Sequence, residues 1–136
     1  MPATASNDIQ AAAAWDTEHL ILFTNKNYLL YNLPTSTIID SNTWKGLPSN
    51  WKGKLDAVCY WKNESLIFFF RDEYIIFNRE SNSYEPLGLI KNWSGWPSNW
   101  KRFSTVINIG NGILYFFNDN QHLRLDINTQ TFEGPF

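Results

Sequence analysis

The sequence repeats itself with a period of almost fifty residues. Segment 44–52 reads Trp-Lys-Gly-Leu-Pro-Ser-Asn-Trp-Lys, and segment 93–101, at an offset of 49 (93 − 44), keeps seven of its nine residues. Segment 11–32 aligns without a gap with 57–78 at an offset of 46 (57 − 11), and 57–78 aligns with 105–126 at an offset of 48 (105 − 57). Self-similarity at a fixed period is the signature of a repeat architecture. We therefore predict a repeat domain over residues 9–136, with repeats at about 9–54, 55–102 and 103–136, after a polar tail over residues 1–8.

Each repeat is predicted to form short antiparallel strands. In the second repeat these are residues 57–60, 66–70 and 74–77 and a last strand near Tyr84, separated by turns of hairpin length. A four-stranded unit of this kind, repeated along the chain, is a propeller blade. The four alanines at 11–14 would favour a helix on propensity alone. Their repeat partners at 57–60 and 105–108 do not, so we predict a strand there and an all-β fold.

Composition narrows the class of protein. The 136 residues suit one domain, and 43% apolar and 17% aromatic residues provide a core. With a net charge of −2, the chain lacks the excess of basic residues that nucleic-acid binding requires. The single cysteine, Cys59, lies in an apolar run and is expected to be a small buried side chain. We find no secretory signal and no apolar run long enough to span a membrane, so we expect a cytoplasmic protein or release by a non-classical route.

These repeats resemble the hemopexin-like repeat. The residues that carry the resemblance are Asp56-Ala57-Val58, the aromatic segment 66–70, the Tyr74-centred segment 74–78 and Trp93-Ser94-Gly95-Trp96-Pro97. The resemblance covers nearly the whole chain from Ile9, and bacterial and plant hemopexin-like proteins are the closest in character. It implies a propeller that closes with four blades.

The resemblance also implies an axial channel that holds ions on main-chain carbonyls. The corresponding positions are Gln10, Asp56 and Ser104. A ring of oxygen ligands suits Ca²⁺ or Na⁺. Only Asp56 has a side-chain carboxylate, so weak affinity is expected, and a packed or water-filled channel is an equal alternative.

Three other residues are candidates for ligand contacts. His19 and His122 are the only histidines, and they occupy different positions in their repeats. This placement disfavours a haem site, and no zinc-ligand spacing is present. Trp44, Trp51, Trp93 and Trp100 recur at equivalent positions and are expected to pack between blades. Trp96 replaces Leu47 of the first repeat, so it is the better candidate for an exposed contact.

The sequence favours a binding module and not an enzyme, because no motif surrounds its serines, cysteine or histidines. The ligand would be a protein or a small molecule, in host interaction or defence as in some bacterial and plant relatives. A haem or metal-ion carrier is the alternative, and a hydrolase is a disfavoured third. The third repeat is shortened and ends before a copy of the Trp-x-Gly-x-Pro segment. We therefore expect open blade faces that are covered by self-association, most simply as a two-fold dimer, or by a larger repeat-containing partner.

Overall fold

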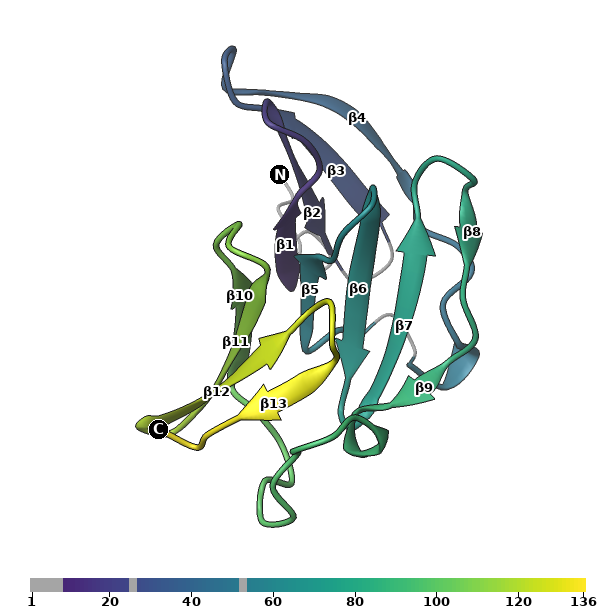
Figure 1. The fold of residues 1–136 in the computed structure, drawn as a ribbon. Coiled ribbons are helices and arrows are strands. Elements are labelled where there is room, and N and C mark those ends of the chain that lie inside the picture. The colour runs from purple at the N-terminus through teal and green to yellow at the C-terminus, as the bar shows by residue number, and fades with distance from the viewer. Residues whose placement is uncertain (1–8, 25–26, 52–53) are drawn as a thin grey trace.

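A computed structural model describes residues 9–24, 27–51 and 54–136, and these form three antiparallel sheets (Figure 1). The polar segment 1–8 lies outside the described residues. Blade 1 contains β1 (Ala11–Ala14), β2 (His19–Phe23), β3 (Asn27–Asn32) and β4 (Thr37–Thr43). Blade 2 contains β5 (Ala57–Tyr60), β6 (Ser65–Phe70), β7 (Glu73–Asn78), β8 (Ser83–Tyr84) and β9 (Gly88–Leu89). Blade 3 contains β10 (Thr105–Asn108), β11 (Ile113–Asn118), β12 (Gln121–Asp126) and β13 (Thr131–Glu133).

The all-β prediction is confirmed, and within each blade the strands follow one another as a meander. Strand β9 departs from this order, because it pairs with the first residues of β7, Glu73 and Tyr74, and not with β8. Two single turns of 3-10 helix, η2 (Ser49–Trp51) and η3 (Ile90–Asn92), lie in the connections that follow blades 1 and 2. Over the described ranges, no helix is long and apolar enough to cross a membrane.

The first strand of each blade lies at the centre of the molecule. Strand β5 packs against both β1 and β10, whereas β4, β8 and β13 lie at the outside (Figure 1). Central strands converge, which favours small side chains. This tertiary demand outweighs the helix propensity of the four alanines, which form β1 and pair with β2 from Ala11↔Phe23 to Ala14↔Leu20.

The middle blade is covered on both faces. In β6, Leu66 and Phe68 pack in a cluster with blade 1, while Ile67 and Phe69 pack in a cluster with blade 3. All four side chains are fully buried. A strand covered on both faces reads as a continuous apolar run, and the sequence of β6 shows this pattern.

Blades 1 and 3 each bury one face. In β1 only Ala13 is buried, and in β10 only Val106. Because neighbours along a strand point to opposite faces, the other face of each of these two sheets is left open among the described residues.

Candidate functional site

The predicted axial positions are equivalent in the structure. Each donates its main-chain N–H to the carbonyl of a phenylalanine at the end of the second strand: Gln10 to Phe23 at 2.7 Å, Asp56 to Phe69 at 2.9 Å and Ser104 to Phe117 at 2.6 Å. All three side chains are exposed. The Asp56 carboxylate accepts a hydrogen bond from the N–H of Arg71 at 2.6 Å, so it caps the β6–β7 turn.

A cavity of about 260 Å³ lies between the three central strands. Its walls are mostly alanine, valine, leucine and isoleucine side chains of β1, β2, β5 and β10. Two of its polar groups bind protein atoms, because Asn108 donates to the carbonyl of Tyr60 at 2.6 Å and the Cys59 thiol donates to that of Val106 at 3.5 Å. Among the described residues, no three His, Cys, Asp or Glu side chains gather as a metal site. The Ca²⁺ or Na⁺ prediction therefore depends on main-chain oxygens alone.

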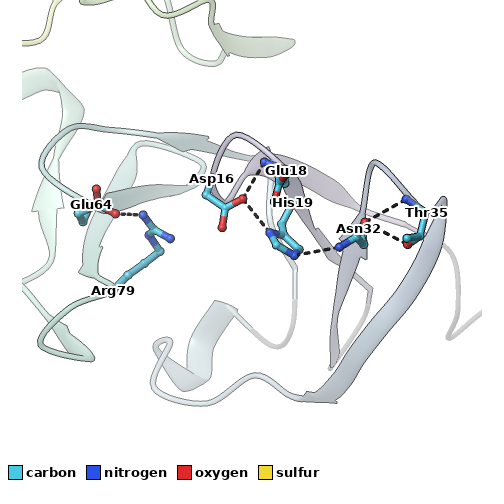
Figure 2. A network of polar contacts seen from close by, with 7 residues as sticks. All are labelled: Asp16, Glu18, His19, Asn32, Thr35, Glu64 and Arg79. Atoms are coloured by element: carbon cyan, nitrogen blue, oxygen red, sulfur yellow. Dashed lines mark hydrogen bonds and ion pairs between the residues drawn. The ribbon is translucent and has the colours of Figure 1, made fainter.

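His19 belongs to a polar network on blade 1 (Figure 2). Its Nδ1 lies 2.8 Å from Oδ1 of Asp16, and its Nε2 lies 3.3 Å from Nδ2 of Asn32. The amide oxygen of Asn32 accepts hydrogen bonds from the N–H and hydroxyl of Thr35, both at 3.0 Å, so its NH₂ group faces the imidazole. Nδ1–H then donates to Asp16 and Nε2 accepts from Asn32. Both ring nitrogens of His19 are engaged within the protein.

The network also affects Asp16. Partial burial raises the pKa of this carboxyl, but hydrogen bonds from His19 and from the N–H of Glu18 hold the pKa below its usual value. Asp16 therefore stays ionised and keeps its role as an acceptor for the turn between β1 and β2.

His122 lies in blade 3, away from this network. It stands opposite Phe117 on β11, and its ring centroid is 5.9 Å from that of Phe117 and 5.3 Å from that of Phe136. Phe117 and His122 point away from blade 2, since the buried Phe116 and Leu123 beside them point toward it. The structure thus assigns the two histidines to different blades.

Trp96 packs at the junction of blades 2 and 3. Its indole ring lies 5.1 Å from the ring of Phe132 and 5.9 Å from that of Phe116, and its N–H donates to the carbonyl of Trp100 at 3.1 Å. Its ring and its donor are therefore used within the junction, although part of the side chain remains accessible. Trp51, Trp93 and Trp100 are buried, whereas Trp44 is half-buried.

The face of blade 1 that points away from blade 2 is apolar. Strand register places its residues in two rows, since directly paired residues share a face. One row is Ala14, Leu20, Tyr31 and Ile38, and the other is Ala12, Leu22, Leu29 and Ser41. We call these eight residues the open face of blade 1. Ile38 is 50% exposed, and the leucines are half-buried.

The open face of blade 3 is more polar. It carries Thr105, Ile107, Tyr115, Phe117, His122, Arg124 and Glu133. Along β12 the buried Leu123 and Leu125 alternate with half-exposed or exposed polar residues. This alternation is typical of a sheet with one solvated face.

Sequence reasoning did not distinguish these two faces, although the signal was present. Segments 20–23 (Leu-Ile-Leu-Phe) and 28–31 (Tyr-Leu-Leu-Tyr) are continuous apolar runs, which are typical of strands covered on both faces. In the structure blade 2 covers one of those faces. The open face of blade 1 therefore has the composition of a covered surface.

No family model matches the sequence, and no curated protein matches it. Solved structures match in fold. The hemopexin fold protein CP4 from cow pea is 10% identical, with a TM-score of 0.63 over 90% of this chain and 62% of that one. A plant lectin with two metal binding sites from Cicer arietinum is 12% identical, with a TM-score of 0.63 over 88% of this chain and 60% of that one.

Glutaminyl cyclase from Myxococcus xanthus is 15% identical, with a TM-score of 0.62 over 92% of this chain and 51% of that one. These likenesses confirm the predicted hemopexin-like propeller fold. The chain spans between half and two thirds of the length of these three structures.

Proposed function

We propose that the chain is a non-catalytic interaction module that binds through the open face of blade 1, and that its occupant is a second copy of the chain. The observation that carries this proposal is the apolar character of that face. By repeat position, Leu20, Leu22 and Leu29 correspond to Leu66, Phe68 and Ile75 of blade 2. Those three side chains are buried against blade 1. The open face thus repeats a surface that is covered elsewhere in the same molecule.

The chemistry of the face suits contact with an identical surface. Its eight side chains are uncharged, so two copies related by a two-fold axis would bring no like charges together. Apolar area removed from water contributes roughly 25 cal/mol per Å². A further blade on a larger repeat-containing partner is the other occupant that would fit.

Two observations support a role without catalysis. Burial raises the pKa of the Cys59 thiol to about 12, so the thiolate that a nucleophilic cysteine requires is scarce. Both ring nitrogens of His19 are used in the network of Figure 2. Among the structures of similar fold one is a lectin and another a cyclase, so the fold by itself admits binding and catalysis alike.

The proposal is tested by the reactivity of single thiols placed inside and outside the face. Leu29→Cys introduces a half-buried thiol on the open face, and Asn50→Cys places one at an exposed position on η2. The native Cys59 is buried, and we expect it to stay unlabelled in both variants. We expect labelling of the Leu29→Cys thiol to slow at least tenfold as protein concentration rises from low to high micromolar, while Asn50→Cys keeps one rate.

If the labelling rates of both variants stayed constant as protein concentration rises, the proposed surface would be rejected. Slower labelling of both variants would point to unspecific aggregation and would also reject the proposed surface. Slower labelling of Leu29→Cys only after a larger propeller protein is added would assign the face to a further blade on a larger partner.

A further inference from the structure

A second pocket, of about 560 Å³, lies at the outside of the junction between blades 1 and 2. Its floor is aromatic and includes Trp15, Tyr28, Trp44 and Tyr84. Two of its polar groups come from the side of β4 that faces blade 2, where Asp40 pairs with Leu30 and Asn42 pairs with Tyr28, and the side chains of Lys45 and Asn82 also line it. The volume lies within the range of about 300–1,000 Å³ that is common for small-ligand sites.

The equivalent space between blades 2 and 3 is filled. There Trp61 stacks on Trp93 with their ring centroids 5.7 Å apart and their planes 8° apart, and both rings are buried. Trp15 and Trp44 are the repeat equivalents of this pair. Both of them line the pocket and are half-buried. The same residue types thus close one junction and leave the other hollow.

The difference is explained by the residue that covers the first tryptophan of each pair. The guanidinium of Arg79 lies over the ring of Trp15, 4.8 Å from its centroid, and its ion pair with Glu64 fixes it there (Figure 2). At the equivalent position blade 3 has Ile127, which is buried in the same core cluster as Trp61 and Trp93. We attribute the empty space to Arg79 of blade 2, because this residue holds the ring of Trp15 against blade 2 and away from Trp44.

The pocket has both a hydrogen-bond donor and a hydrogen-bond acceptor. The indole N–H of Trp44 is buried and has no acceptor among the described residues. The Tyr84 hydroxyl lies close to this N–H without the geometry of a hydrogen bond, and donates its own proton to the carbonyl of Lys45 at 2.6 Å. Asp40, which also lines the pocket, accepts a hydrogen bond from the Tyr28 hydroxyl at 3.0 Å and remains exposed. A buried donor without a partner costs about 1–3 kcal/mol, so a ligand oxygen that reached this N–H would be favoured.

We propose that this pocket binds a neutral sugar ring, with Asp40 accepting from its hydroxyls and Trp44 donating to one of them. A pyranose has an apolar C–H face for the aromatic floor, hydroxyl donors for the Asp40 carboxylate and hydroxyl oxygens for the indole N–H. The amides of Asn42 and Asn82 at the rim can donate and accept in the same way. An organic cation would suit Asp40 and the aromatic rings but would leave the Trp44 N–H without an acceptor.

The site does not involve the open face of blade 1, so its test is independent of the proposed association. A panel of methyl pyranosides is titrated into the full chain by calorimetry, with choline chloride as the cationic probe. Asp40→Asn removes the carboxylate and keeps its shape at an exposed position. Glu85→Gln makes the same change at an exposed glutamate on the outer edge of blade 2. Arg79→Ile introduces the residue type of blade 3 without touching the ligand.

We expect saturable binding of at least one glycoside, weakened at least tenfold by Asp40→Asn and unchanged by Glu85→Gln. Arg79→Ile should abolish binding while the melting temperature is kept, because Trp15 is then free to stack on Trp44. Binding of choline with no glycoside, no saturation with any glycoside, or equal affinity of Asp40→Asn and wild type would each overturn the proposal.

Discussion

Single residues of one type have different roles in this chain because their neighbours differ. Trp15 and Trp61 share a repeat position, yet one lies under an arginine and the other in a tryptophan stack. His19 is held by Asp16 and Asn32, whereas His122 lies among the rings of blade 3. The repeat predicts where each side chain sits along its strand. It cannot predict which partner meets the side chain across a junction, since that depends on the next blade.

At the scale of single residues, we predict that the Cys59 thiol resists alkylation in the folded protein. The thiol is 4% exposed, and burial raises its pKa to about 12. At pH 8 the folded protein should resist iodoacetamide, while the chain unfolded in urea should be labelled once, because its thiol then returns to its ordinary pKa of about 8.5. Mass spectrometry of both samples checks this, and stoichiometric labelling of the folded protein would contradict the buried position.

At the scale of strands, most of the fold could be predicted from the sequence. The β1 strand over 11–14 and the pair β6 and β7 follow from the repeat and from apolar runs. The four-stranded repeat predicts an outer strand in blade 1, but the seven-residue length of β4, which is exposed throughout, and the short β9 could not be predicted in this way. Their pairing depends on main-chain hydrogen bonds to β3 and β7, which leave no apolar pattern in the sequence. The pocket beside β4 was missed for the same reason.

Strand packing predicts unequal costs for two equivalent substitutions. Phe69 on β6 is fully buried between blades 2 and 3, while its repeat equivalent Phe117 on β11 is half-buried on the open face of blade 3. Phe69→Ala should lower the free energy of unfolding by about 3–5 kcal/mol, since it leaves a cavity in a packed core. Phe117→Ala should cost less than about half as much, because water can reach the site. Urea unfolding followed by fluorescence measures both, and equal losses would argue against the assignment of the faces.

At the scale of the whole molecule, the described chain is an arc of three blades with its middle blade covered on both sides (Figure 1). The sequence predicted open faces from the number of repeats, but it treated the two ends of the arc alike. The structure separates them: the face of blade 1 is apolar, while polar residues alternate with buried leucines on blade 3. Self-association should therefore involve the face of blade 1.

The mass of the wild-type chain in solution tests the central claim most directly. Light scattering on a dilution series should give a particle of twice the chain mass of 15.9 kDa at high micromolar concentration, and the single-chain mass after sufficient dilution. This result would follow from burying two copies of the open face of blade 1 against each other. A mass of 15.9 kDa throughout the series, with no partner present, would show that the face remains in water and would contradict the account.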